Sequence, residues 1–264
     1  MGIVWHTRRV RETPLVVTAG QQARSMLPLE PFLLAKDAIQ FPQPYVKWSC
    51  EPARAEDVPA AIARAYYVAM QPPKGPTFVS IPVDDWDREC CRVVPRVVSS
   101  CVRGDSTLLS DADKSLLVAK APVFIFGAGV ARDDAWCEAI ALAERHEAPV
   151  WASPMSSRNS FPENHRLFRG FLPASREGIA TSLEGHDLIL VVGAPVFTYH
   201  IEGFGPFIPS GAKLYQIVDD PSLAAWAPVG TAILSSAKAF FQDWLSGRRH
   251  QGDRLPQTGY APRN

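Results

Sequence analysis

The apolar residues of this chain follow two alternating patterns. Short continuous apolar runs, such as residues 122–126 and 188–192, are typical of strands buried on both faces of a parallel sheet. Between them lie longer segments, such as residues 133–147, whose apolar residues recur at helical spacing. The alternation predicts an α/β fold with a doubly wound parallel sheet and right-handed crossovers.

The pattern is sparse in the first third of the chain and regular afterwards. The expected early elements are strands at residues 14–19 and 77–82, an extended piece at 45–49 and a helix at 55–70. The expected later elements are strands at residues 122–126, 149–152, 188–192, 213–218 and 232–234, and helices at 111–118, 133–147, 174–183 and 237–245. Residues 27–44 and 153–173 are predicted to be loops.

Two polar segments set the expected domain boundaries. Residues 89–105 show no helical stripe and predict a linker, while the polar residues 249–264 predict a disordered tail. A partial α/β domain is therefore expected at residues 1–88, and a Rossmann-like domain at residues 106–248. The early part has too few strands to bury a core of its own.

Composition argues against several classes of function. The 264 residues include 27 basic and 27 acidic side chains, so the formal net charge is zero and nothing favours nucleic acid or an anionic membrane. No apolar run is long enough to span a bilayer, and the first twelve residues do not have the pattern of a secretory signal. The five cysteines lack metal-ligand spacing and predict reduced thiols of a cytoplasmic protein.

The most suggestive polar residues follow the apolar run at 188–192. Tyr199 and His200 come just after Gly193, Ala194 and Pro195, where a parallel sheet presents the carboxyl ends of its strands. Imidazole is well suited to proton transfer near neutral pH, so His200 is a candidate acid or base. The alternative is a histidine that only forms hydrogen bonds within its loop.

Four other groups of residues are each open to two interpretations. Residues 127–129 (Gly-Ala-Gly) resemble part of a phosphate-binding turn, but acidic residues at 133 and 134 favour a plain strand-to-helix turn. The acidic pair at 219 and 220 either binds ribose hydroxyls or caps the next turn, and capping is favoured. Gln21 and Gln22 either bind a polar ligand or satisfy the loop backbone. Residues 32–34 (Phe-Leu-Leu) either line an apolar pocket or belong to the core.

A series of short motifs resembles the benzoylformate decarboxylases, a family of thiamin-diphosphate-dependent decarboxylases of 2-keto acids. The resemblance covers residues 13–244 and is specific because many motifs occur in one order. The motifs are residues 18–22 (Thr-Ala-Gly-Gln-Gln), 46–49 (Val-Lys-Trp-Ser), 82–87 (Pro-Val-Asp-Asp-Trp-Asp), 142–145 (Leu-Ala-Glu-Arg), 168–170 (Phe-Arg-Gly), 183–187 (Leu-Glu-Gly-His-Asp) and 193–200 (Gly-Ala-Pro-Val-Phe-Thr-Tyr-His).

The resemblance implies roles for individual residues. His200 matches an active-site histidine that takes part in proton transfer, and Gln21 is a candidate for binding the cofactor. Phe32 and Leu33 occupy the positions of two leucines that line the family's substrate pocket, so Phe32 departs from that pattern. Tyr199 is also expected to line the substrate pocket. The residues that match a peripheral cation site, with altered side chains, are Gln40, Phe41 and Gln43.

The resemblance also implies an incomplete enzyme. Residues 1–88 correspond to the second half of the pyrimidine-binding domain and residues 106–248 to the central domain. The family's cofactor-activating glutamate and its magnesium-binding Gly-Asp-Gly motif have no counterpart in this sequence. The chain is therefore expected to be a fragment that does not bind thiamin diphosphate and magnesium by itself and is inactive alone.

Two further expectations come from the family, and two other functions remain open. The family acts on small 2-keto acids and forms dimers or tetramers. For benzoylformate, the reaction is a step of mandelate degradation. A non-catalytic structural or interaction module derived from the family is the alternative function. A nucleotide-binding Rossmann protein, which rests only on residues 127–129, is the weakest of the three readings.

Overall fold

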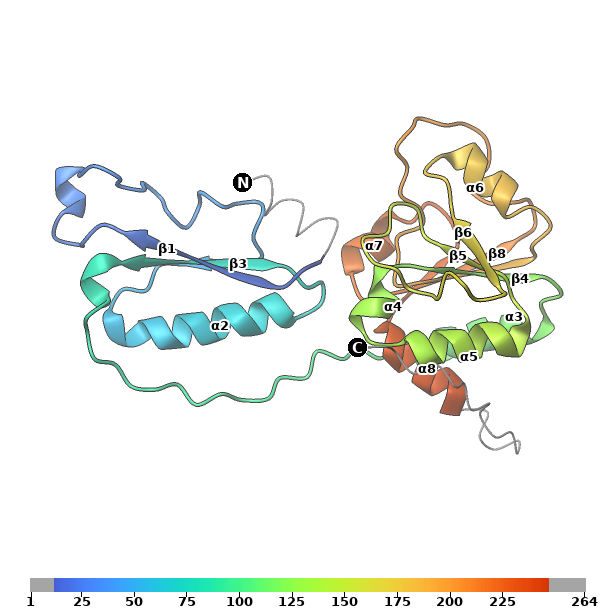
Figure 1. Ribbon diagram of the computed structural model, residues 1–264, viewed down its shortest axis with the longest axis horizontal. Helices are drawn as coiled ribbons and strands as arrows, with labels where there is room; N and C mark the ends of the chain where they lie inside the picture. Colours follow the sequence, from blue (N-terminus) through green and yellow to red (C-terminus); the bar gives the residue numbers. More distant parts are fainter. Residues whose placement is uncertain (1–11, 247–264) are drawn as a thin grey trace. The chain divides into compact units, whose positions relative to one another are not determined.

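The computed structural model describes residues 12–246, so the expectations for residues 1–11 and for the tail at 249–264 lie outside it. The chain divides between Ser100 and Cys101 into two compact units, which are described one at a time (Figure 1). Within the described range, no helix has the length and apolar character needed to cross a membrane.

The first unit is a small parallel sheet with one long helix. Its strands are β1 (Leu15–Gln21), β2 (Ser49–Cys50) and β3 (Pro76–Pro82), in the order β1-β3-β2. The helix α2 (Val58–Met70) packs against β3 and β1 and lies along one face of the sheet (Figure 1). Its buried residues Ala65 and Ala69 are small, which lets the helix lie close to the strands.

The second unit is a six-stranded parallel sheet in the order β6-β5-β4-β7-β8-β9. The strands are β4 (Pro122–Phe126), β5 (Val150–Ala152), β6 (Phe168–Phe171), β7 (Leu188–Val192), β8 (Lys213–Val218) and β9 (Thr231–Leu234). The helices are α3 (Ser106–Val118), α4 (Ala128–Arg132), α5 (Trp136–His146), α6 (Arg176–Ser182), α7 (Pro221–Trp226) and α8 (Ala237–Ser246). The predicted α/β class with a doubly wound parallel sheet is confirmed.

Alternate side chains of the central strands enter two separate cores. Phe124 and Phe126 of β4 pack with residues of α3, α5 and α8 on one face of the sheet. Val123 and Ile125 of the same strand pack on the other face with Ile179 of α6 (Figure 1). Because both faces are covered, β4 and β7 are apolar at every position, which is the pattern that predicted them.

Four details of the predicted elements are wrong. Helix α3 begins at Ser106 rather than at 111, because Asp105 caps it by accepting hydrogen bonds from the N–H groups of Thr107 (2.9 Å) and Leu108 (3.0 Å). The helix expected at 133–147 begins only at Trp136 of α5, since Asp134 just before it adopts a positive φ of 51°, and the separate short helix α4 precedes the expected range. The loop expected at 153–173 contains β6, and α7 was not expected at all.

Candidate functional site

The carboxyl edge of the central sheet is held by a close contact between two glycine turns. Gly127 donates its N–H to Val192 O (3.0 Å), and Gly129 donates to Gly193 O (2.9 Å). A Cβ atom on Gly129 would lie 2.5 Å from the Cα atom of Gly193, so no side chain fits there. Gly193 itself has a φ of 67°, which favours glycine.

This contact distinguishes between the two interpretations of residues 127–129, a phosphate-binding turn and a plain strand-to-helix turn. The N–H of Gly129 is bonded to Gly193 O, and the N–H of Val130 is bonded to Gly127 O, so these two donors are turned into the fold rather than toward a phosphate. The Asp133 carboxylate accepts a hydrogen bond from Ala237 N (2.7 Å). The interpretation as a plain strand-to-helix turn is confirmed.

The acidic pair after β8 also has structural partners. Asp219 lies 3.9 Å from Arg132, and both side chains are less than a tenth exposed. Asp220 caps α7 by accepting a hydrogen bond from Ser222 N (2.8 Å). The favoured interpretation, a cap, is confirmed for Asp220.

The segment after β7 carries the two candidate residues of the second unit. Val196 and Phe197 are buried in the core beside α6, while the next residues turn outward. His200 is exposed, and its backbone N–H donates to Ala174 O (2.8 Å). The backbone of His200 is therefore fixed while its imidazole faces solvent.

Tyr199 lies half-buried next to an aromatic and cationic cluster. Its ring centroid is 6.5 Å from that of Phe207, and the guanidinium carbon of Arg176 lies 3.6 Å from the Phe207 centroid. Burial raises the pKa of Tyr199, and the nearby Arg176 charge opposes that rise. The Tyr199 hydroxyl is buried and has no hydrogen-bond partner within residues 12–246.

A carboxylate of α6 anchors the same segment further along. Glu177 Oε1 accepts a hydrogen bond of 2.5 Å from the backbone N–H of Phe204. This hydrogen bond lowers the pKa of Glu177, because it stabilises the ionised carboxylate. The segment from Tyr199 to Phe204 is thus held at two points, by the backbone of Ala174 just before α6 and by the side chain of Glu177 in α6.

The first unit holds the other candidates, beginning with Gln21 at the end of β1 and Gln22 just after it. Gln21 is buried, its Nε2 donates to Ala35 O (2.9 Å), and its Oε1 accepts from Gln22 N (3.0 Å) and Ala35 N (3.3 Å). Gln22 Nε2 donates to Phe32 O (2.8 Å). Both amides therefore bind the loop backbone, as the second interpretation expected, and a cofactor role for Gln21 remains a prediction.

The expected pocket and cation residues of this loop face outward. Phe32 is 88% exposed and Leu33 is 77% exposed, so neither belongs to a core within this unit. Gln40 and Phe41 are also exposed, and Gln43 Nε2 lies 3.3 Å from Ser49 Oγ. Among the residues described, no group of three or more His, Cys, Asp or Glu side chains could hold a metal ion.

Sequence reasoning missed the residue that fixes this loop. Arg24 binds both carboxylate oxygens of Asp85, at 2.6 and 2.8 Å, and also binds Pro52 O at 2.9 Å. The Asp85 side chain is 5% exposed, so its charge is shielded from water by the pairing. The available signal was a lone arginine after one strand and an acidic pair after another, since parallel strands end at the same edge.

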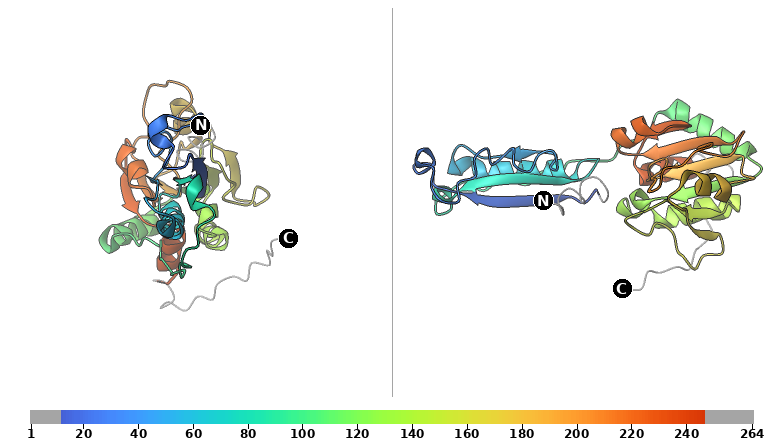
Figure 2. Two further views of the ribbon diagram at one scale, coloured as in Figure 1. Left: turned by 90° about the vertical axis from the view of Figure 1, so that its left-hand side faces the viewer. Right: turned by 90° about the horizontal axis from the view of Figure 1, so that it is seen from above.

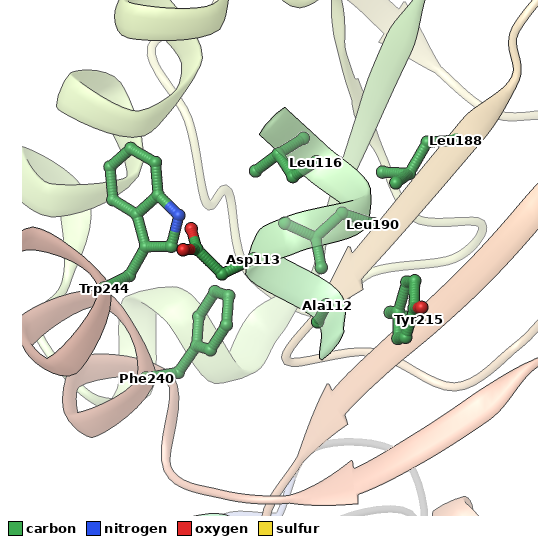
Figure 3. Close-up of a pocket in the computed structure, with 8 residues that line it drawn as sticks. All are labelled: Ala112, Asp113, Leu116, Leu188, Leu190, Tyr215, Phe240 and Trp244. Atoms are coloured by element: carbon green, nitrogen blue, oxygen red, sulfur yellow. The ribbon is translucent and has the colours of Figure 1, made fainter. Parts of the chain in front are cut away.

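The pocket drawn in Figure 3 lies in the second unit and differs from the candidate sites in being lined by core residues. It lies between α3, α8 and the sheet, and its lining is largely apolar. The lining residues are Ala112, Asp113, Leu116, Leu188, Leu190, Tyr215, Phe240 and Trp244. The Tyr215 hydroxyl donates to Asp111 Oδ2 (2.6 Å) and lies 2.9 Å from Ser115 Oγ, so its polar group is satisfied by α3. None of the candidate residues lines this pocket.

Comparison with known proteins places the chain in a family. The model of the family described as "Thiamine pyrophosphate enzyme, central domain" matches residues 109–243, which is half of the chain. The chain therefore belongs to the thiamine pyrophosphate enzymes, a family whose name implies thiamine diphosphate as its cofactor.

Particular relatives agree with the resemblance seen in the motifs. Benzoylformate decarboxylase of Pseudomonas aeruginosa is 43% identical over 93% of this chain and 47% of its own length. The crystal structure of benzoylformate decarboxylase from Polynucleobacter necessarius matches with a TM-score of 0.86 and 44% identity, over 92% of this chain and 46% of that one. A thiamine diphosphate-dependent 4-hydroxybenzoylformate decarboxylase of Rhodococcus jostii RHA1 matches with a TM-score of 0.83 and 40% identity, over 96% and 49%. The chain spans about half the length of these relatives.

We expect Arg24→Lys to destabilise the first unit by about 1–2 kcal/mol, because lysine cannot bind both oxygens of the shielded Asp85 carboxylate. Urea denaturation measures this change. The matched control is Arg54→Lys, whose pair with Asp57 has side chains that are 70% and 44% exposed, and it should cost clearly less than Arg24→Lys. Equal costs for the two variants would contradict the account.

We expect the Phe204 amide to report the ionisation of Glu177, with a midpoint below the ordinary glutamate value of 4.5. Because the folded pKa is lowered, the stabilisation is complete above the unfolded value and is lost as pH falls through the folded value. Proton–nitrogen NMR spectra recorded between pH 7 and pH 2 follow this amide. Glu177→Gln should abolish the titration. A midpoint at or above 4.5 in the wild type would contradict a lowered pKa for Glu177.

Proposed function

We propose that this chain forms part of a thiamin-diphosphate-dependent decarboxylase that acts on an aromatic 2-keto acid of the benzoylformate type. The observation that carries the proposal is the 43% identity to benzoylformate decarboxylase over 93% of the chain. The solved structures of a benzoylformate decarboxylase and a 4-hydroxybenzoylformate decarboxylase, at 44% and 40% identity, support the same substrate class. The products would be carbon dioxide and the corresponding aldehyde.

His200 is the residue proposed to transfer a proton during this reaction. Its backbone is bonded to Ala174 O while its imidazole is exposed, so the ring is free to meet a substrate brought to the carboxyl edge of the sheet. Tyr199, whose hydroxyl is buried without a partner among the described residues, is proposed to contact the substrate beside it. Phe32 and Leu33 of the first unit are exposed apolar residues, and their role in a substrate pocket is proposed only from the resemblance.

The described residues do not make a complete cofactor site. When bound in the family, thiamin diphosphate accepts the electron pair that decarboxylation releases. Both ends of the Gln21 amide bind loop backbone here, and residues 12–246 present no cluster of acidic or histidine side chains for magnesium. The peripheral cation site at Gln40, Phe41 and Gln43 is proposed only from the resemblance.

The chain by itself is therefore proposed to be catalytically inactive. The Gly-Asp-Gly motif that binds magnesium in the family does not occur in the sequence. A cytoplasmic location and assembly into dimers or tetramers, as in the family, are part of the same proposal. The alternative, a non-catalytic module, is favoured by the internal hydrogen bonds of Gln21 and Gln22.

We expect the purified chain neither to bind thiamin diphosphate tightly nor to release carbon dioxide from benzoylformate. The reason is that the described residues include no group of three or more His, Cys, Asp or Glu side chains that could hold the metal ion. Isothermal titration calorimetry with cofactor and magnesium, and a carbon dioxide assay, measure the two properties. An intact benzoylformate decarboxylase serves as the positive control. Clear turnover by the chain would refute the proposed inactivity.

We expect His200→Ala to lower turnover more than stability when residues 13–244 replace their counterpart in an intact benzoylformate decarboxylase. A positioned acid or base contributes about a hundredfold or more to rate, whereas an exposed loop side chain leaves little cavity when removed. Turnover and thermal melting measure the two effects. His186→Ala is the matched control, since that imidazole lies at Ala121 O, on the opposite edge of the sheet. Early melting with unchanged turnover per folded molecule would make His200 structural.

A further inference from the structure

A groove of about 420 Å³ lies on the first unit, between α2 and the irregular segment at residues 93–96, and we call it the α2 groove. Figure 1 and Figure 2 (left) show this segment on the side of α2 that faces away from the sheet. The helical side of the groove includes Ala60, Ala63, Arg64 and Tyr67, which recur at helical spacing and share one face of α2. The volume is that of a small-molecule site, for which about 300–1,000 Å³ is usual.

A single tyrosine fixes the segment at residues 93–96 to the helix. The Tyr67 hydroxyl donates a hydrogen bond to Arg96 O (3.0 Å) and accepts one from Arg96 N (2.8 Å). The guanidinium carbon of Arg96 lies 4.7 Å from the centroid of the Tyr67 ring. Both sides of the α2 groove are therefore formed and joined by residues 60–96, which lie within one unit.

The arginines that line the α2 groove carry positive charge without an acidic partner. No lining residue is acidic, and among residues 12–246 neither Arg64 nor Arg96 forms an ion pair with a carboxylate. Arg64 instead stacks on Trp48, with its guanidinium carbon 5.1 Å from the ring centroid. Stacking holds a guanidinium in place and leaves its in-plane N–H donors available. Two cations on one groove repel each other, so an anion bound between them would remove that repulsion.

The rest of the lining is largely apolar and partly open to solvent. Val93 and Val94 are 37% and 82% exposed, and together with Ala60 and Ala63 they form apolar surface beside the arginines. A ligand with an apolar body would cover these side chains while its charged end met the guanidinium groups. A flat ring suits the body because it has no internal rotation to lose on binding. A carboxylate suits the charged end because its two planar oxygens match the guanidinium fork, whereas the more highly charged phosphate costs more to desolvate beside valines.

We infer that the α2 groove binds a small aromatic carboxylate, with the carboxylate on Arg64 and Arg96 and the ring against Val93 and Val94. Every contact comes from residues 60–96, so the site needs neither a cofactor nor a second chain. None of these residues belongs to the candidate site, so the inference does not rest on the proposed decarboxylase.

Proton–nitrogen NMR titration of the full chain with benzoate tests the inference. Benzoate should shift the amides of α2 and of residues 93–96 in a saturable way, with a dissociation constant on the order of 1 mM for so small a ligand. Benzamide, which has the ring without the charge, and acetate, which has the charge without the ring, should each bind at least about tenfold more weakly.

Two variants and a matched control locate the binding site. Arg64→Gln and Arg96→Gln each remove one charge from the groove and should raise the dissociation constant for benzoate at least about fivefold. Arg92→Gln removes the same charge at an exposed position that does not line the groove, and should leave the constant unchanged. Circular dichroism establishes that each variant is folded. Should either groove variant lose its folded spectrum, nuclear Overhauser effects in the wild type decide, because the benzoate ring protons must contact the methyl groups of Ala63 and Val93.

Three results would overturn the inference. The first is the absence of a saturable shift up to about ten times the expected dissociation constant. The second is equal binding of benzoate and either benzamide or acetate, since the groove would then not recognise a charged ring. The third is a set of shifts centred on Tyr199 and His200, with the amides of α2 unchanged, because benzoate would then bind the candidate site instead.

Discussion

The second unit depends on the approach of two glycine turns at the carboxyl ends of β4 and β7. Gly127 and Gly129 bond to Val192 O and Gly193 O, and Gly193 N bonds to Ile217 O in β8 at 2.8 Å. Three neighbouring strands are thereby tied at one edge. The contact requires glycine because an added Cβ on Gly127 would lie 2.4 Å from the Cβ of Ala194.

The carboxyl edge of the sheet determines where the candidate catalytic residue His200 lies. Because β7 is held at its end, the chain leaves the sheet in one direction, buries Val196 and Phe197, and then exposes His200. In the first unit, Gln21 at the end of β1 holds the following loop through backbone hydrogen bonds, and Arg24 holds it through its pairing with the Asp85 carboxylate. Both units thus use rigid strand ends to present loop residues, which is where open α/β sheets place their ligands.

Much of the fold could be predicted from the sequence because burial on both faces makes a strand apolar at every position. β4 and β7 were found this way, with bounds that agree with the structure. The strand β6 was not found, since its alternation of half-buried and exposed residues over four positions is too weak to distinguish from a loop. The start of α5 at Trp136 rather than at 133 was missed because a positive φ at Asp134 leaves little trace in the pattern. Motifs pointed to His200 and Gln21 as candidates, and their roles stay predictions. The pairing of Arg24 with Asp85 joins residues sixty-one positions apart and could not be derived from local spacing.

Native-state hydrogen exchange tests most directly whether the glycine contact organises the central sheet. The account predicts that the amides of Gly127, Gly129 and Gly193 exchange only when the whole second unit unfolds, with free energies of opening equal to that of global unfolding. The His200 amide, bonded to Ala174 O in an exposed segment, should exchange through a smaller local opening. If the three glycine amides exchange as readily as that of His200, the carboxyl edge is not the fixed point of the structure, and the central claim is wrong.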